Sequence, residues 1–280
     1  MADHLVIPAP AKLNLVLRVG PRAPDGYHPL GTLLVALAGL EDTVTIAAAP
    51  SRTLSCPGAP DGPANLAWRA VDALEAACAR PLPARIDIVK RIPMQAGLGG
   101  GSSDAAAVLI GLTALYRLGL DVRELERLAA DLGSDVPFFV RGGTQWATGR
   151  GERLLPRSRP TDLWAVICGP VAPLSTTEVY RTFDRLGHCG AIDPAPPTEP
   201  WTSGGWVGND LWQAARTLAP ELGAAADDLA RLGAHEVLLC GSGGAMAGLW
   251  TSRAAAEAAA GQLRSVIAVT SPRPRVTGTG

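Results

Sequence analysis

The chain has 280 residues with 25 basic and 26 acidic side chains, so its formal net charge is −1. Without a broad positive field, nucleic acid and anionic membranes are poor candidates for its partners. Hydrophobic residues make up 47% of the chain and charged residues 18%, which excludes an intrinsically disordered protein. At roughly 100 to 200 residues per domain, the length predicts a folded protein of two domains.

The N-terminal segment over residues 5–19 alternates apolar and polar residues in part. This pattern predicts strands that are interrupted by a bend at Pro8 and Pro10. Because side chains two residues apart point to the same face of a strand, Lys12 and Asn14 are expected to lie together.

Turn-forming residues follow at 22–29, where proline and then Asp-Gly supply fixed and positive φ angles. The turn predicts that Tyr27 and His28 are exposed just beyond it. The next predicted elements are strands over 32–40, 43–47 and 85–89 and a helix over 66–79 that Asn65 can cap.

The most informative stretch is 92–118, IPMQAGLGGGSSDAAAVLIGLTALYRL. It predicts a strand ending at Pro93, a glycine-rich loop and an Ala-rich helix capped by Ser102 or Ser103. Glycine N–H groups together with the positive end of a helix dipole favour a bound phosphate. The loop is not a Walker A motif, because Ser102 stands where that motif needs lysine, and it also misses GxGxxG. The alternative is a tight turn with a purely structural role.

Asp135 follows a predicted helix over 123–132 that ends at Gly133, and it precedes an apolar run over 136–140. The run predicts a strand, so Asp135 would stand at a helix-to-strand junction as a fixed general base. A local cap or turn is the alternative role for such an aspartate.

The C-terminal half predicts a second set of strands and helices. They are a hairpin over 141–152, a strand over 163–168, a Ser/Thr-capped helix within 173–183, a long loop over 186–209, helices within 210–232 that break near Pro220, strands over 236–240 and up to Trp250, a helix through Leu263 and a strand near 265–270.

The cysteines are odd in number, widely spaced and without a CxxC pair, so they predict reduced thiols rather than a zinc site or a disulfide framework. They are Cys56, Cys78, Cys168, Cys189 and Cys240. The chain shows neither the pattern of a secretory signal peptide nor an apolar run of membrane-spanning length. These features favour a cytoplasmic protein. Lys12 and Lys90 are the only lysines in this arginine-rich chain, a hint that their compact ammonium groups are needed.

Five motifs in chain order resemble those of the GHMP small-molecule kinases. They are PAKLNL at 10–15, DGYH at 25–28, PMQAGLGGGSSDAAA at 93–107, DVPFFVRGG at 135–143 and GSGGA at 241–245. Together they look most like the member of the non-mevalonate isoprenoid pathway that phosphorylates the 2-hydroxyl of a methylerythritol unit. The resemblance implies an α+β fold of two domains, an ATP-binding domain over 1–158 and a C-terminal domain over 159–280, with the active site in the interdomain cleft.

The resemblance also implies roles for individual residues, with ATP and Mg²⁺ as cofactors and no metal ligand assigned. Asp135 would be the catalytic base and Lys12 its cationic partner. The ATP-binding residues would be Asn65, near the adenine, and Pro93, Met94, Gln95, Ala96, Gly97, Leu98, Gly99, Gly100, Gly101, Ser102 and Ser103. The substrate, a small molecule with a cytidine diphosphate group, would contact Asn14, Tyr27, His28, Tyr180, Gly241, Ser242 and Gly243.

Two departures from the family pattern bear on the ATP contacts. Gln95-Ala96 stands where glycines are common, and Cys240 stands where the family usually has a hydroxyl residue. A kinase of homoserine, mevalonate or a sugar and a catalytically silent sensor remain the alternative functions, and either a monomer or a homodimer is compatible with the sequence.

Overall fold

The computed structural model describes residues 4–187, 192, 201–203 and 205–272. It divides into two compact units, each assembled from separate segments of the chain. Unit 1 comprises Met1–Ala11, Leu40–Met94 and Gly99–Gly142, and unit 2 comprises Lys12–Gly39, Gln95–Leu98 and Gly143–Gly280. The mixture of helices and strands confirms the predicted α+β class. The domain division at residues 158 and 159 follows a different criterion and stays a prediction.

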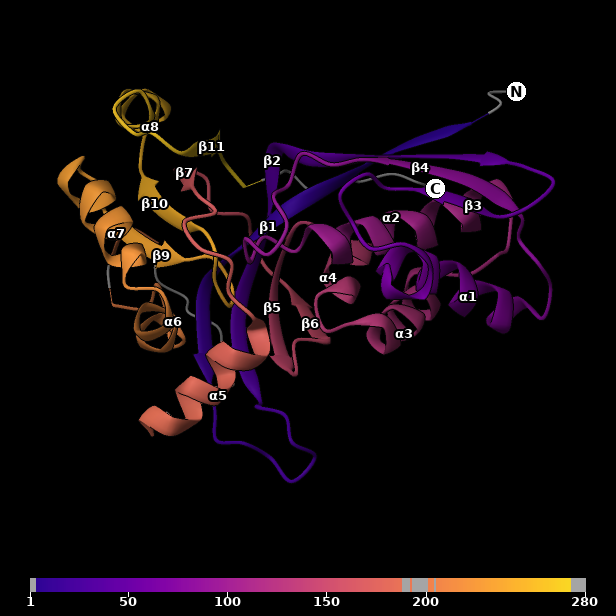
Figure 1. Ribbon diagram of the computed structural model, residues 1–280, viewed down its shortest axis with the longest axis horizontal. Coiled ribbons are helices and arrows are strands. Elements are labelled where there is room, and N and C mark those ends of the chain that lie inside the picture. Colours follow the sequence, from indigo (N-terminus) through magenta and orange to yellow (C-terminus); the bar gives the residue numbers. More distant parts are fainter. Residues whose placement is uncertain (1–3, 188–191, 193–200, 204, 273–280) are drawn as a thin grey trace. The chain divides into compact units, whose positions relative to one another are not determined.

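Unit 1 is a sheet with four helices against one face (Figure 1). Its strands run in the order β3-β4-β2-β1, and β2 pairs antiparallel with β4. The strand bounds are Leu5–Val19 for β1, Leu30–Ala48 for β2, Thr53–Ser55 for β3 and Ala84–Val89 for β4. The helix bounds are Leu66–Cys78 for α1, Gly100–Leu115 for α2, Val122–Leu132 for α3 and Val136–Arg141 for α4, with a 3-10 turn at Gly62–Ala64.

Helix α2 packs closely against this sheet because Gly111 has no side chain. A Cβ built on Gly111 would lie 2.3 Å from Ile7 Cδ1 and 2.5 Å from Ile46 Cδ1. The same face of the sheet buries Val44, Ile46, Ile86 and Ile88 completely or nearly so. The Ala-rich sequence of α2 therefore serves close helix-to-sheet packing.

Strands β1 and β2 are longer than predicted, and both pass from one unit into the other. The predicted bend at Pro8 and Pro10 is wrong, because β1 continues through both prolines. Within unit 1 this part of β1 is the edge strand of the sheet. A proline there, which lacks an N–H, does not interrupt the hydrogen bonds between strands. The predicted break between 40 and 43 is also wrong, because β2 is continuous.

Three further predictions around the central motifs are wrong. β4 ends at Val89 rather than at Pro93, and Gly99, with φ +75°, is the N-cap of α2 in place of Ser102 or Ser103. The apolar run after Asp135 forms helix α4 rather than a strand. A short apolar run does not by itself distinguish a strand from a buried helix, and Pro137 fits the first turn of a helix.

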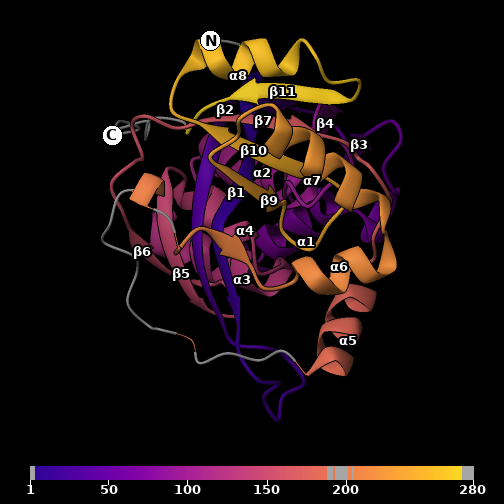
Figure 2. The same cartoon turned by 90° about the vertical axis from the view of Figure 1, so that its left-hand side faces the viewer.

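Unit 2 contains a four-stranded antiparallel sheet in the order β11-β7-β10-β9. Helices α7 and α8 pack on it (Figure 2). The strand bounds are Thr144–Gly149 for β5, Arg153–Pro156 for β6, Trp164–Cys168 for β7, Gly208–Asn209 for β8, Glu236–Leu239 for β9, Met246–Trp250 for β10 and Val266–Thr270 for β11. The helix bounds are Thr176–Leu186 for α5, Trp212–Leu218 for α6, Glu221–Arg231 for α7 and Arg253–Ala260 for α8, with a 3-10 turn at Trp201–Ser203.

The remaining strands of unit 2 pair with the long strands. β5 pairs antiparallel with the first part of β2 and with β6, so a hairpin forms as predicted but lies over 144–156 rather than 141–152. β8 pairs parallel with β1 at Val16 and Leu17. The unit's hydrophobic core joins the sheet to its helices and includes Val166, Phe183 and Trp250.

Most predicted elements of the second half are confirmed, including the helix break near Pro220. Ser175 is the N-cap of α5, but its side chain makes no capping hydrogen bond. Much of the predicted loop over 186–209 lies outside the described residues. The described cysteines are free thiols, as predicted, and Cys189 lies outside them. Among the described residues, no helix has the length and apolar character needed to cross a bilayer.

Helix α3 supplies a test of local stability, because it begins with a reciprocal capping box. Asp121 Oδ1 accepts from Glu124 N at 2.8 Å, and Glu124 Oε2 accepts from Asp121 N at 2.7 Å. Asp121→Ala is expected to lower the free energy of unfolding by about 1 kcal/mol, whereas Asp121→Ser, which retains a capping oxygen, should lower it by clearly less. Urea denaturation measures both values, and equal losses would contradict the capping role.

Candidate active-site elements

The first group of candidate residues lies in unit 2 around the buried ammonium of Lys12. Lys12 is 4% exposed, and its Nζ donates to Asn14 Oδ1 at 2.5 Å. Asn14 Nδ2 in turn donates to Thr32 Oγ1 at 2.8 Å, and Thr32 donates to the carbonyl of Val16. The prediction that Lys12 and Asn14 share one face is confirmed. A buried ammonium needs such oxygen partners because desolvation of a charge is costly.

The predicted phosphate loop packs against the C-terminal glycine turn, again within unit 2. A Cβ on Gly97 would lie 1.8 Å from the Cys240 carbonyl oxygen, and one on Gly244 would lie 2.1 Å from the Gln95 carbonyl oxygen. Lys12 is part of this contact, because its N–H donates to the Leu98 carbonyl at 3.0 Å and its Nζ lies 2.9 Å from a Cβ built on Gly241. Only glycine allows backbones to approach so closely.

Both departures from the family pattern fall in this contact. Gln95 adopts φ +57°, a left-handed conformation that strains any residue with a Cβ. Cys240 is fully buried, and its pKa is raised to about 12 by that burial, against the effect of the neighbouring Lys12. The Cys240 thiol therefore stays protonated and fills space, and the nearby hydroxyl is that of Ser242, which lies 2.7 Å from Thr176 Oγ1.

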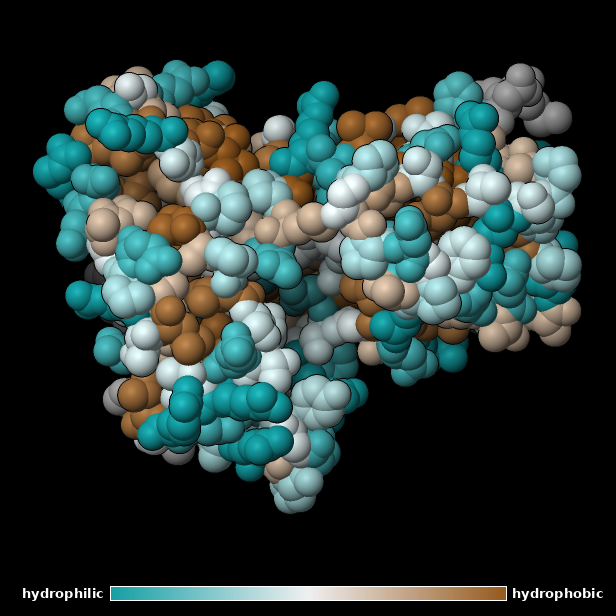
Figure 3. Space-filling view, in the orientation of Figure 1, coloured by the Kyte–Doolittle hydropathy of each residue, from teal (hydrophilic) through white to brown (hydrophobic). Residues whose placement is uncertain are grey.

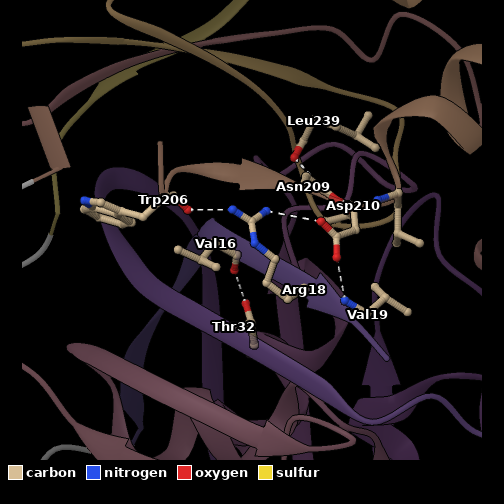
Figure 4. Close-up of polar contacts among 10 residues, drawn as sticks. Val16, Arg18, Val19, Thr32, Trp206, Asn209, Asp210 and Leu239 are labelled. Carbon is tan, nitrogen blue, oxygen red and sulfur yellow. Dashed lines mark hydrogen bonds and ion pairs between the residues drawn. The ribbon is translucent and has the colours of Figure 1, made fainter. Parts of the chain in front are cut away.

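Asn209 supports the glycine turn from strand β8 (Figure 4). Its Nδ2 donates to the carbonyls of Leu239 at 2.9 Å and Gly241 at 2.6 Å, while its Oδ1 accepts from Leu211 N. Beside it, Asp210 accepts from Val19 N at 2.9 Å and pairs with Arg18. The Asn209 contacts fix the turn through backbone carbonyls, and the Asp210 contacts hold the end of β1. The sequence interpretation missed both residues, because Asn209 ends a stretch that carries little periodicity and Asp210 marks only the start of a predicted helical region.

The second part of the glycine loop begins helix α2 in unit 1. Ser103 N donates to the Gly99 carbonyl at 2.9 Å, so the helix starts inside the loop. Gly101 has nothing within 4 Å of a Cβ position, and Ser102 is half-buried. Ser103 Oγ is buried with no hydrogen-bond partner among the described residues. Backbone N–H groups at this helix end have the chemistry that a phosphate requires.

The second lysine, Lys90, lies directly behind this loop and forms a buried ionic cluster in unit 1. Its Nζ donates to Asp42 Oδ2 and, at 2.6 Å, to Asp104 Oδ2. Asp42 Oδ1 also accepts from the N–H groups of Arg91, at 2.5 Å, and Ile92, at 2.8 Å. The cluster thus ties the segment before the loop to the first turns of α2.

Burial governs the protonation of this cluster. Burial raises the pKa of Asp104 to about 7, although the Lys90 ammonium opposes the shift. Burial lowers the pKa of Lys90, but the two carboxylates outweigh it and the net pKa is raised. The Lys90 ammonium therefore remains charged. As the pH falls, Asp104 is the carboxylate of the cluster that takes up a proton first. The sequence hint that both lysines are needed pointed to this cluster, but its aspartates could not be identified.

Asn65 caps α1, as predicted. Its Oδ1 accepts from Ala67 N at 2.9 Å, and its Nδ2 donates to the Pro60 carbonyl at 3.0 Å. Asn65 is 8% exposed, so its amide is engaged by the fold. Two other predicted ATP-binding residues stand at the entry of the loop, where Met94 is 50% exposed and Pro93 is half-buried.

Asp135 stands in unit 1 between α3 and α4, rather than at a helix-to-strand junction. It occupies the N-cap position of α4, but its side chain makes no capping hydrogen bond. The structural alternative of a simple cap is therefore not supported. The side chain is half-buried, and the following residues Val136 to Phe139 are buried, so the chain on its C-terminal side is held in the core.

The predicted substrate-binding aromatic residues lie in unit 2. Tyr27 is 55% exposed, as predicted, and the Arg150 guanidinium lies 4.8 Å from its ring centroid. The prediction that His28 is exposed is wrong, because it is only 8% exposed and packs against α5. Its ring centroid lies 5.4 Å from that of Tyr180 and 5.9 Å from that of Phe183.

Comparison with known proteins first defines the class. Residues 65–143 match the model of the GHMP kinases N terminal domain. The fold resembles the mevalonate kinase of Methanococcus jannaschii with a TM-score of 0.70 at 14% identity, covering 98% of this chain and 99% of the other. The protein therefore has the GHMP kinase fold, and kinases of this class use ATP as phosphoryl donor.

More similar proteins define the family within that class. The chain is 40% identical to the 4-diphosphocytidyl-2-C-methyl-D-erythritol kinase of Rhodococcus jostii (strain RHA1), covering 96% of this chain and 93% of the relative. It is 38% identical to the crystal structure of a 4-(cytidine 5'-diphospho)-2C-methyl-D-erythritol kinase, with a TM-score of 0.79 over 96% of this chain and all of that one. The chain belongs to the 4-diphosphocytidyl-2-C-methyl-D-erythritol kinase family.

The close backbone contact in unit 2 can be tested at Gly97. Gly97→Ala would force a Cβ into the Cys240 carbonyl oxygen and would keep φ at +76°, so both packing and conformation oppose it. We expect the free energy of unfolding to fall by about 3 kcal/mol. Gly101→Ala is the matched control, since its Cβ meets no atom within 4 Å. Thermal unfolding without ligand compares the variants, and equal melting temperatures would contradict the contact.

The buried cluster predicts a pH dependence of stability. Because the pKa of Asp104 is raised from its ordinary value near 4 to about 7, its favourable contribution is complete below pH ~4 and is lost as the pH rises to ~7. Asp104→Asn does not titrate, so its free energy of unfolding should rise relative to that of the native chain between pH 4.5 and 7.5. Asp87→Asn, at a half-exposed position on β4, is the control. Parallel urea-denaturation profiles for the native chain and Asp104→Asn would contradict the shift.

Proposed function

We propose that the protein transfers the γ-phosphoryl group of ATP to the 2-hydroxyl of 4-diphosphocytidyl-2-C-methyl-D-erythritol. The observation that carries this proposal is the 40% identity to a kinase of that name over nearly the whole of both chains. The residues of the five motifs support it, because they supply a phosphate-binding loop, a carboxylate, a buried ammonium and aromatic rings. The reaction belongs to the formation of isoprenoid precursors by the non-mevalonate route.

Asp135 acts in this proposal as the general base that accepts the proton of the acceptor hydroxyl. Asp135 is half-buried at the start of α4, and the buried residues that follow it fix its backbone, as a positioned base requires. Lys12 acts as the cation that stabilises negative charge during transfer. The Lys12 ammonium is buried and is oriented by its hydrogen bond to Asn14 Oδ1, so it presents a fixed positive charge.

ATP is bound in this proposal by residues 93–103, with backbone N–H groups and the start of α2 at the phosphates and Asn65 near the adenine. The residues fit the group, because glycines expose the amides and the Ser103 hydroxyl is buried with no partner in the described part of the chain. Mg²⁺ supplies positive charge on the phosphate oxygens when ATP is bound. We assign it no protein ligand, since the described residues contain no cluster of three potential metal-binding side chains.

The cytidylyl end of the acceptor is bound in this proposal by Asn14, Tyr27, His28 and Tyr180, while Gly241, Ser242 and Gly243 close the site. An aromatic ring with an exposed face, such as that of Tyr27, can stack on a pyrimidine. A small polar acceptor such as homoserine or mevalonate offers no base to stack. The aromatic residues therefore favour the cytidylyl acceptor over the other acceptors of this class.

The setting of the enzyme completes the proposal. We place it in the cytoplasm, where ATP is abundant, as a monomer or homodimer without nucleic-acid or membrane partners. The functional division that we propose is an ATP-binding domain over residues 1–158 and a C-terminal domain over residues 159–280.

Acceptor specificity tests the proposed function. ATP consumption with Mg²⁺ is measured with 4-diphosphocytidyl-2-C-methyl-D-erythritol, 2-C-methyl-D-erythritol, homoserine, mevalonate and galactose. We expect turnover with the cytidylyl compound alone, because only it can use the aromatic residues. Turnover with another acceptor would replace the proposed substrate, and no turnover with any acceptor would favour a sensor that binds without catalysis.

The same assay tests Asp135 against a matched carboxylate. Asp135→Ala should lower kcat by a factor of about 10² to 10⁴ while ATP affinity stays nearly unchanged, because a general base acts in the transition state. Asp131→Ala removes an exposed carboxylate on the preceding helix and should keep full activity. Retained turnover in Asp135→Ala would refute its role as base.

A further inference from the structure

His28 joins the turn that carries Tyr27 to the helix that carries Tyr180. Its Nδ1 lies 2.8 Å from the Gly20 carbonyl oxygen, and its Nε2 lies 3.2 Å from Asp184 Oδ1 on α5. The imidazole is 6% exposed, whereas the Asp184 side chain is 36% exposed. The buried ring is thus held at both nitrogens.

The hydrogen-bond chemistry of these two contacts defines what the ring can do. A carbonyl oxygen only accepts, so Nδ1 must donate to Gly20. Nε2 faces the Asp184 carboxylate at 3.2 Å, so the second ring nitrogen is also occupied by a partner within the fold. Neither nitrogen then remains for the edge of a bound base.

We propose that Asp184 and the His28 side chain are positioning residues, which set the position of Tyr27 relative to Tyr180 for stacking on the cytosine ring. This inference rests on the proposed function and deepens its substrate site. It assigns a role to Asp184, and it moves the role of the His28 imidazole from contact with the base to the link between two structural elements.

The turn itself has the local contacts of a compact unit. Gly20 N donates to the Pro29 carbonyl at 2.9 Å, which closes the turn, and Ala23 N donates to the Tyr27 carbonyl at 2.7 Å. Tyr27 N donates to Asp25 Oδ1 at 3.0 Å. A compact turn moves as one body, so a link at His28 next to Tyr27 controls the position of that tyrosine.

One face of the Tyr27 ring is covered by the Arg150 guanidinium at 4.8 Å, so a base can stack only on the other face. Stacking energies depend strongly on ring separation, and a displacement of about 1 Å can remove much of the benefit of an oriented site. The part of the surface where Figure 1 places α5 carries many hydrophilic side chains (Figure 3), and Asp184 is exposed on this helix. The carboxylate is therefore accessible to substitution without opening a buried cavity.

Two substitutions of Asp184 distinguish the contact with His28 from the negative charge of the carboxylate. Asp184→Ala removes the partner of Nε2. Asp184→Asn keeps a link, because its amide N–H can donate to Nε2 of a neutral imidazole whose Nδ1 still donates to Gly20. Glu178→Ala is the control, since Glu178 is an exposed carboxylate on the same helix.

Steady-state kinetics of the full chain provide the first readout. Asp184→Ala should raise KM for the cytidylyl acceptor about tenfold, as expected for loss of a charge-assisted hydrogen bond, with kcat and KM for ATP nearly unchanged. Asp184→Asn should recover most of the affinity, and Glu178→Ala should behave like the native chain. A KM that is unchanged in Asp184→Ala, or raised equally in Asp184→Asn, would overturn the proposal.

Calorimetric binding of cytidine diphosphate provides a second readout that does not require turnover. The affinities should follow the same order, with Asp184→Ala weakest, while thermal unfolding of the variants stays close to that of the native chain. Failure of the native chain to bind cytidine diphosphate would overturn the positioning role. Binding without phosphorylation of the cytidylyl acceptor would instead count against the proposed function and leave the positioning role supported. If Asp184→Ala does not fold, Asp184→Ser serves as the variant without the link.

Discussion

The candidate phosphate loop depends on one constraint. Its backbone and that of the C-terminal glycine turn approach so closely that no side chain fits between them. Gly97 and Gly244 lie where a Cβ would collide with backbone carbonyls, and the Lys12 N–H donates to the same loop. A loop held this way has little conformational freedom left to lose when it binds an anion. The strained φ of Gln95 is consistent with this, because a strained residue persists only where its surroundings fix it.

The chain's two lysines show how a buried cation depends on its partners. Lys12 Nζ donates to the amide oxygen of Asn14, whose Nδ2 in turn donates to Thr32. Lys90 is held by two carboxylates and is neutralised within the cluster. The carboxylates around Lys90 join separate chain segments, whereas the Asn14 amide orients the Lys12 ammonium within one strand.

The sequence predicted those parts of the structure that local rules determine. The Asn65 cap, the end of α3 at Gly133 and the break near Pro220 each depend on a residue and its immediate neighbours. The helix after Asp135 was not predicted, because its six residues are too few to show a period. The contacts of Lys90 with Asp42 and Asp104 were not predictable either, since they join residues 48 and 14 positions apart through tertiary packing.

His28 illustrates the same limit at the level of chemistry. The motif identifies a histidine beside an exposed tyrosine, and a free imidazole there would suit the edge of a base. Tertiary packing instead buries the ring and assigns both nitrogens to Gly20 and Asp184. Because backbone groups beside a fixed ring are also fixed, a residue can determine which ligand binds without offering its own side chain. Recognition of the base would then depend on the geometry of the two tyrosines, and recognition of phosphate on the geometry of the glycine loop. In both cases buried polar contacts hold in place the groups that meet the ligand, which are tyrosine rings for the base and backbone amides for the phosphate.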